Sequence, residues 1–273
     1  MLIRILSGLA ALAVLFPAAW FGGWWFAALA FPVVGVCLYE WFGMTLPGDL
    51  LGRWVGVGLG LGLAFAVTSG HASGEAGLGV MVGVLLLPLL FFLLRPGDTP
   101  TAGSRAALMV TGVLWLGGLG GVATSLDFLH GGFGWLILAA VLAFGSDVGG
   151  YFVGRAIGRT PLYPKISPKK TLEGSLGGVV LATALAFPFS AAFGPDLAPG
   201  HLLVIAPLGA ALGQLGDLCQ SLLKRSMGVK DSGAIMPGHG GLFDRIDSLL
   251  FVGPPMFLYA RWVLGVEVTW LPS

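Results

Sequence analysis

Residues 77–94 read GLGVMVGVLLLPLLFFLL and contain no charged side chain. This length is close to the roughly 20 mostly apolar residues that an α-helix needs to cross a bilayer. A helix also satisfies its own backbone hydrogen bonds, which lipid cannot do. The stretch therefore predicts a transmembrane helix.

The composition of the chain extends this prediction beyond one segment. Of 273 residues, 56% are hydrophobic and 10% are charged, and the mean hydropathy is +0.91. Soluble domains carry about 25% charged residues. The net charge of +1 provides no general attraction to nucleic acid, so we expect no nucleic-acid partner. Cys37 and Cys219 lie far apart and without metal-ligand spacing, and we interpret both as packing residues.

Nine segments qualify as membrane spans and predict an all-α, polytopic integral membrane protein. No linker or repeat divides the chain, so residues 1–273 are expected to form one membrane domain. Helices 1–5 would occupy residues 1–130, and helices 6–9 would occupy residues 131–273. The predicted spans are 3–21, 23–42, 53–70, 77–94, 105–125, 134–154, 174–193, 201–223 and 248–266.

The first predicted span has an alternative interpretation. Arg4 precedes an apolar run that ends at Pro17-Ala18-Ala19, a pattern that is also typical of a cleavable signal peptide. Because hydrophobicity resumes at Trp20 and continues to Phe42, we favour two closely connected spanning helices.

The basic residues fall on one side of the predicted topology. If the N-terminus and the loops after helices 2, 4, 6 and 8 share a side, that side holds thirteen of the 14 Lys and Arg residues. The opposite loops hold none, and Arg261 lies within or beside the last helix. The positive-inside rule then makes the N-terminus and the long loops 155–173 and 224–247 cytoplasmic. We expect a multi-pass protein of the cytoplasmic, or inner, membrane.

The first long loop combines charges and hydroxyl groups. Asp147, Tyr151 and Arg155 precede it at i, i+4 and i+8, and an aspartate this deep in an apolar helix is a functional candidate. Hydroxyl donors beside cations suit phosphate, as in the stretch that contains Ser167, Lys169 and Lys170. The alternative is a basic patch that fixes topology or attracts lipid headgroups.

The second long loop follows a polar stripe on helix 8. The stripe has helical spacing and consists of Gln214, Asp217, Ser221, Lys224 and Arg225. An ion pair of Asp217 with Lys224, or with a cation on another helix, would be its structural explanation. The loop itself contains five glycines, which let backbone N–H groups approach an anion closely.

Acidic residues around this loop predict a metal. Asp244 and Asp247 are i, i+3 neighbours, and adjacent carboxylates repel each other unless a cation or proton lies between them. With Asp217 and Asp231 they supply hard oxygen donors, which favours Mg²⁺ over zinc. Acidic residues, Lys and Arg residues and a glycine-rich loop together indicate phosphoryl or nucleotidyl transfer. The chain lacks the GxxxxGK[ST] motif of P-loop enzymes.

These polar positions match a known family. Residues 221–247, SLLKR-x4-KDSG-x2-MPGHGGLFDRID, resemble the signature of the phosphatidate cytidylyltransferases, also called CDP-diacylglycerol synthases. The similarity extends to residues 167–174, to Asp147-x3-Tyr151-x2-Gly154 and to Glu40. It is strong over 145–250 and weak over 1–130.

The resemblance implies a Mg²⁺-dependent reaction of phospholipid biosynthesis. The phosphate of phosphatidate would attack the α-phosphorus of CTP, release pyrophosphate and give CDP-diacylglycerol. A site at the cytoplasmic ends of helices 6, 8 and 9 would meet both the lipid and soluble CTP.

The resemblance also implies roles for the matching residues. Asp217 and Asp244 would carry the metal, with Asp247 and Asp231 as further ligands or as their partners. His239 would either donate a hydrogen bond to pyrophosphate or fix the glycine turn. The expected contacts with CTP or lipid are Lys224, Arg225, Lys230, Ser167, Lys169, Lys170, Ser221 and Arg245.

Three other functions are considered. A polyprenol kinase or a cytidylyltransferase for another lipid phosphate would use similar groups, although the Asp244-Arg245-x-Asp247 motif argues against the kinases. A transporter would carry its charges at mid-depth, often in two repeats, whereas here they gather at one face. An inactive scaffold is disfavoured by the intact motif residues. Association into a homodimer is left open.

Overall fold

The computed structural model describes residues 13–236 and 240–269. Within these ranges the secondary-structure elements are helices and one two-stranded hairpin, joined by loops. The elements are a helical segment at 13–21, α2 (Trp24–Thr45), α3 (Leu50–Thr68), α4 (Gly74–Leu94), α5 (Thr99–Gly112), η1 (Val113–Leu119), α6 (Gly120–Thr124), η2 (Ser125–Phe128), α7 (Gly132–Ile157), β1 (Pro161–Tyr163), β2 (Ser167–Thr171), α8 (Leu172–Phe193), α9 (Pro199–Ser226) and α10 (Phe243–Trp262). The predicted all-α, polytopic architecture is confirmed, with the hairpin as an addition inside the predicted loop 155–173.

Seven helices in the described part of the chain are long and apolar enough to cross a membrane. They correspond to predicted spans two to eight, and the continuous helical run Thr99–Phe128, with the π-helix η1 inside it, is one of them. Helix α10 occupies the position of the ninth predicted span. It is not one of the seven because each of its 18-residue stretches carries at least three charged side chains. The predicted span 3–21 lies mostly outside the described residues.

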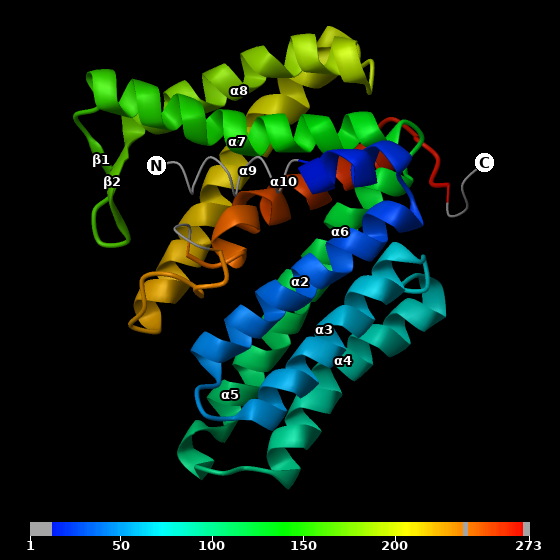
Figure 1. Cartoon of the computed structure of the whole chain (residues 1–273), viewed down its shortest axis with the longest axis vertical. Helices are drawn as coiled ribbons and strands as arrows, with labels where there is room; N and C mark the ends of the chain where they lie inside the picture. The colour runs from blue at the N-terminus through cyan, green and yellow to red at the C-terminus, as the bar shows by residue number, and fades with distance from the viewer. Residues whose placement is uncertain (1–12, 237–239, 270–273) are drawn as a thin grey trace.

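The helices form two packed groups that share α10. In Figure 1, α7 and α8 run side by side across the top, and the bundle of α2 to α6 lies below them. One apolar cluster joins the lower bundle to Phe243 and Leu250 of α10, and the other joins α7, α8 and α9 to Val252 and Met256. Helix α10 therefore ties the N-terminal helices to the C-terminal ones.

Glycines allow two of the helix contacts to be unusually close. A Cβ atom added at Gly149 of α7 would lie 2.9 Å from the Cα atom of Gly178 in α8. A Cβ atom added at Gly117 would lie 2.4 Å from the backbone oxygen of Gly60 in α3. Real side chains do not fit at these distances, so glycine is required there for the packing, as it is in many membrane helix pairs.

The loops divide by charge between the two ends of the helices. The loops 46–49, 95–98, 158–171 and 227–242, with the adjoining helix ends, form what we call the basic end. The opposite loops, 22–23, 69–73, 129–131 and 194–198, contain no Lys or Arg. In Figure 1 the hairpin and the loop after α9 both lie on the left, at the basic end. The polar motifs of the sequence are thus gathered on one side of the helices.

Candidate active site

Asp244, in the first turn of α10, is the most heavily hydrogen-bonded carboxylate of the basic end. Its Oδ1 lies 2.6 Å from Lys224 Nζ and accepts a hydrogen bond of 3.0 Å from Gln220 Nε2. Its Oδ2 accepts hydrogen bonds from the backbone N–H groups of Ser232, at 2.9 Å, and Gly241, at 3.1 Å. The Asp244 and Lys224 side chains are only 8% and 11% exposed. Asp244 therefore joins α9, the glycine-rich loop and α10, and its charge also suits the N-terminus of a helix.

A second ion pair joins the hairpin to α9. Lys170 Nζ contacts Asp217 Oδ2, and Ser221 Oγ donates a hydrogen bond of 3.4 Å to Asp217 Oδ1. Asp217 thus forms an ion pair, but its partner lies in strand β2 rather than on a helix, and Lys224 bonds Asp244 instead. Consecutive side chains in a strand point to opposite faces, so Lys169 is directed away from this pair and is exposed.

The hairpin is held in place by the start of α8. Thr171 caps this helix by accepting a hydrogen bond from Gly174 N at 3.1 Å. The Glu173 carboxylate accepts hydrogen bonds from the backbone N–H groups of Arg159 and Thr160. Because both ends of the hairpin are bonded to α8, the position of Lys170 relative to α9 is well defined.

Gln214 joins the polar stripe of α9 to both α7 and α8 by hydrogen bonds. Its Nε2 donates to Ser146 Oγ of α7 at 2.8 Å and to the Ser175 backbone oxygen of α8 at 3.0 Å. Its Oε1 accepts a hydrogen bond from Ser175 Oγ. Gln214 therefore acts in packing, and the reactive part of the stripe begins one turn later, at Asp217.

Three carboxylates influence one another beside these ion pairs. Asp247 is 8% exposed and accepts a hydrogen bond of 2.7 Å from its neighbour Ser248 N. The charges of Asp217 and Asp147 act on it, and Asp147 also experiences the charges of Lys170 and Arg245. The cluster thus brings negative charge from α7, α9 and α10 together, with cations at its edge.

Glu40 of α2 holds the glycine-rich loop from the N-terminal half of the chain. It is 3% exposed, and it accepts hydrogen bonds from Ser232 Oγ at 3.0 Å, Leu242 N at 3.0 Å and Phe243 N at 2.9 Å. A Cβ atom added at Gly241 would lie 2.5 Å from Glu40 Oε2. Sequence reasoning noted Glu40 as part of the resemblance but assigned it no role. The available signal was that Glu40 is the one charged residue of α2, and intramembrane carboxylates are functional candidates.

The remaining predicted residues surround the two ion pairs. Arg225 is exposed and donates a hydrogen bond to the Val229 backbone oxygen at 3.2 Å. Ser167 lies in β2 opposite Tyr163 and is half-buried. His239 falls outside the described residues. Lys230, Asp231 and Arg245 are exposed.

The described residues thus bring six of the predicted side chains into one linked group, which we call the two-pair cluster: Lys170, Asp217, Ser221, Lys224, Asp244 and Asp247. Its oxygen donors are of the kind that Mg²⁺ prefers. No three Asp, Glu, His or Cys side chains within the described ranges are close enough to hold one ion by themselves. Mg²⁺ commonly takes one or two carboxylates together with substrate phosphates, so this donor set fits a metal that binds with a nucleotide.

The two-pair cluster suits polyphosphate because each of its lysines lies beside a carboxylate. A phosphate could replace that carboxylate as the partner of the lysine, and a metal cation could replace the lysine as the partner of the carboxylate. Charge-assisted contacts of this kind position phosphoryl groups and neutralise the charge that develops on them. The glycine-rich loop adds the backbone N–H groups of Ser232 and Gly241, which both donate to Asp244.

Several curated proteins are similar to part of this chain. A phosphatidate cytidylyltransferase of Bacillus subtilis is 48% identical over 128 residues, which is 47% of each chain. A phosphatidate cytidylyltransferase of Mycobacterium tuberculosis is 35% identical over 189 residues, 66% of this chain and 57% of that one. An uncharacterized protein of Escherichia coli, YnbB, is 34% identical over 197 residues, 66% of this chain and 63% of that one. The chain spans about half the length of the first of these curated relatives and less than two thirds of the other two.

The comparison that covers most of the chain is with a family. The model of the cytidylyltransferase family matches residues 2–263, which include every residue of the two-pair cluster. This multi-pass membrane protein therefore belongs to the cytidylyltransferase family.

Proposed function

We propose that this protein transfers a cytidylyl group from CTP to phosphatidate, forming CDP-diacylglycerol and pyrophosphate. The observation that carries the proposal is the two-pair cluster, with a glycine-rich loop bonded to it, at one end of a membrane bundle. The names of the Bacillus subtilis and Mycobacterium tuberculosis relatives support phosphatidate as the acceptor.

The reaction needs little acid–base catalysis. A phosphate monoester has its second pKa at about 6, so the attacking oxygen of phosphatidate is largely ionised at neutral pH. That oxygen forms a bond to the α-phosphorus of CTP while the bond from this phosphorus to the bridging oxygen of the β-phosphate breaks. The leaving pyrophosphate carries away the negative charge. Lys170 and Lys224 would hold the phosphates in line, assisted by the exposed Arg225 and Lys230.

Mg²⁺ is the cofactor that the carboxylates suit best. One or two of Asp217, Asp244 and Asp247 would hold it together with phosphate oxygens of the substrate, with Asp231 near the same loop. When bound, Mg²⁺ would neutralise charge on the transferring and leaving phosphates. Lys170 and Lys224, which lie beside Asp217 and Asp244, would be the cations available to phosphate oxygens.

The proposed location is the cytoplasmic face of the inner membrane. Twelve of the 14 Lys and Arg residues lie in the loops and adjoining helix ends of the basic end, and the positive-inside rule makes that end cytoplasmic. CTP is soluble, whereas the phosphate of phosphatidate lies at the membrane surface. A site at the basic end would therefore reach both substrates without moving either through the membrane.

The proposal is tested by pyrophosphate release from the purified protein in detergent micelles. We expect release only when CTP, Mg²⁺ and phosphatidate are all present, with an equal amount of CDP-diacylglycerol formed. If a different lipid phosphate alone supports release, the family chemistry stands and phosphatidate is wrong as the acceptor. If well-folded protein releases no pyrophosphate with any lipid phosphate, the enzymatic proposal is refuted.

The two adjacent lysines of β2 offer a matched test of the hairpin. Lys170→Ala should lower kcat/KM by about tenfold or more, because a charge-assisted contact contributes about 1.5–3 kcal/mol. Lys169→Ala should raise the KM for CTP or phosphatidate by a smaller factor, because Lys169 is exposed and lies on the other face of the strand. Steady-state kinetics with each substrate varied would measure both effects. If Lys169→Ala leaves the steady-state kinetics unchanged, that residue serves membrane topology or lipid attraction. If Lys170→Ala leaves them unchanged, the hairpin is not part of the site.

A further inference from the structure

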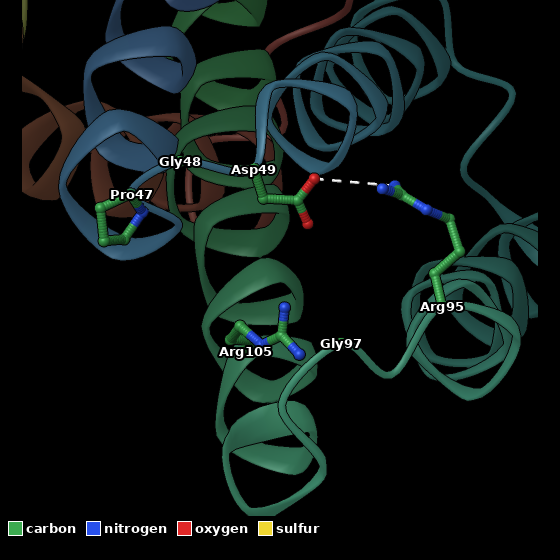
Figure 2. A pocket seen from close by; sticks show the side chains of 6 residues that line it. All are labelled: Pro47, Gly48, Asp49, Arg95, Gly97 and Arg105. Atoms are coloured by element: carbon green, nitrogen blue, oxygen red, sulfur yellow. Dashed lines mark ion pairs between the residues drawn. The ribbon is translucent and has the colours of Figure 1, made fainter.

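A separate pocket lies at the basic end of the N-terminal bundle. It has a volume of about 520 Å³ and lies between the α2–α3 turn and the α4–α5 loop. Its lining residues are Pro47, Gly48, Asp49, Arg95, Gly97 and Arg105. None of them belongs to the two-pair cluster, and the proposed cytidylyl transfer does not use them. Figure 2 shows Asp49 and Arg95 reaching toward each other, with Arg105 near Gly97.

Arg105 is fixed in the wall of this pocket. Its Nη2 donates hydrogen bonds to the backbone oxygens of Pro96 and, at 3.4 Å, Asp98, and its guanidinium lies 5.0 Å from the centre of the Phe92 ring. Its Nε–H group is buried and makes no hydrogen bond with any described residue. The half-buried Arg105 side chain lines the pocket, so a ligand there would meet a guanidinium whose position is already set.

Arg95 faces the same pocket with a weaker attachment. Its Nη1 lies 3.6 Å from Asp49 Oδ1, and its side chain is 50% exposed. Asp49 has another role, since its Oδ1 accepts a hydrogen bond of 2.9 Å from Gly52 N at the start of α3. An anion could therefore take Arg95 from Asp49 without removing the cap of α3. The pocket is lined by two guanidinium groups and one carboxylate. Its net charge is therefore positive, which favours an anionic ligand.

The surface beside the pocket is apolar. Leu50 and Leu51 open α3, and Leu93 and Leu94 close α4, and all four side chains are exposed. On membrane helices such side chains face acyl chains. A ligand with an anionic head in the pocket and apolar chains along α3 and α4 would match both surfaces.

We propose that this pocket binds the phosphate of an anionic phospholipid. Arginine presents several N–H donors in a planar fork that suits phosphate oxygens. Basic pockets between membrane helices on the cytoplasmic side commonly hold lipid headgroups. Arg105 and the weakly held Arg95, which both line the pocket, would supply the donors, and the adjoining leucines would contact the chains.

The test measures lipid binding to the purified full chain in detergent micelles by native mass spectrometry. The probes are phosphatidylglycerol, zwitterionic phosphatidylcholine and inorganic phosphate. We expect saturable binding of phosphatidylglycerol, with the Kd raised about tenfold in Arg95→Gln/Arg105→Gln, in line with the loss of charge-assisted hydrogen bonds. Arg261→Gln is the matched control. It removes an arginine charge in the last turn of α10, outside the pocket, and should leave the Kd unchanged.

Three results would overturn the proposal. Equal phosphatidylglycerol affinity in the double variant and the unaltered protein would exclude the pocket as the site. Equal affinity for phosphatidylcholine would exclude recognition of the anionic charge. Binding of inorganic phosphate with the same loss in the double variant, and with no preference for the lipid, would assign the pocket to free phosphate. If the double variant fails to fold, Arg95→Gln alone serves, because its exposed side chain is held only loosely, by the 3.6 Å ion pair and by a contact 5.5 Å from the centre of the Phe91 ring. These readouts do not depend on turnover, so they remain valid if the cytidylyl transfer proposal fails.

Discussion

Asp244→Asn should remove nearly all CTP-dependent turnover while the protein remains folded in the membrane. The loss expected is about 10²- to 10³-fold in kcat, as found when one charge-stabilising group is removed from an active site. Asparagine keeps the shape of Asp244 but not its charge, and it leaves one oxygen to serve four donors from α9 and the glycine-rich loop. Pyrophosphate release measures the effect, and Asp196→Asn, an exposed residue of the opposite end, is the matched control.

The structure complicates this prediction in a way that can be tested. Lys224 is only 11% exposed, so loss of the Asp244 charge leaves a nearly buried ammonium group without its partner. Breaking such a pair costs about 3–5 kcal/mol of stability. The double variant Lys224→Met/Asp244→Asn removes this unpaired charge and should be more stable than the single variant, as measured by thermal unfolding. If Asp244 served only to neutralise Lys224, the double variant would recover activity, and that result would contradict a role in the reaction.

The membrane fold was predictable because its signals are local. Length, low charge and the one-sided distribution of Lys and Arg define spans and loops without any knowledge of packing. The exceptions have physical causes. The first turns of helix α10 carry Asp244, Arg245 and Asp247. These charged residues lie in or beside the candidate site, and they make the helix less apolar than the other predicted spans. The segment 161–171 forms a hairpin whose flanking residues are joined by hydrogen bonds from Thr160 N to the Glu173 carboxylate, contacts that no hydropathy pattern encodes.

The site was predictable as a set of residues but not as a set of contacts. Helical spacing placed Asp217, Ser221 and Lys224 on one stripe, and the structural alternative was that Asp217 pairs with Lys224 or with a cation on another helix. The observed partners are Lys170, from a hairpin 47 residues away in sequence, and Asp244, 20 residues beyond Lys224. Those pairings depend on how α8 and α10 pack on α9. Periodicity within one helix carries no information on that packing.

Glu40 illustrates the same limit over a greater distance. It lies 192 to 203 residues from its three hydrogen-bond donors, and it joins the N-terminal bundle to the loop that bears Asp244. The N-terminal helices, where the family resemblance is weak, therefore contribute directly to the shape of the candidate site. A carboxylate inside an apolar helix was the available signal, and the fold explains what it binds.

Glu40→Gln should lower kcat/KM for CTP by roughly 10- to 100-fold, because hydrogen bonds to a charged group contribute about 1.5–3 kcal/mol each. The glutamine amide has one acceptor oxygen, and its NH₂ group would face the Leu242 or Phe243 N–H donor. We assign Glu40 a positioning role, so the KM for CTP should rise as well as kcat fall. Glu75→Gln, an exposed change at the opposite end, is the control for the loss of a carboxylate.

Hydrogen exchange separates this positioning role from a general loss of stability. In Glu40→Gln, the backbone amides of Leu242 and Phe243, which donate to this side chain, should exchange faster, because the carboxylate that accepts their hydrogen bonds is lost. The amides of α3 and α7 should keep their protection, since neither helix depends on Glu40 for its hydrogen bonds. Faster exchange throughout the protein would indicate destabilisation of the whole fold. Unchanged exchange and unchanged KM would mean that the loop is positioned without Glu40, and its conformation would then have to be set by Asp244 alone.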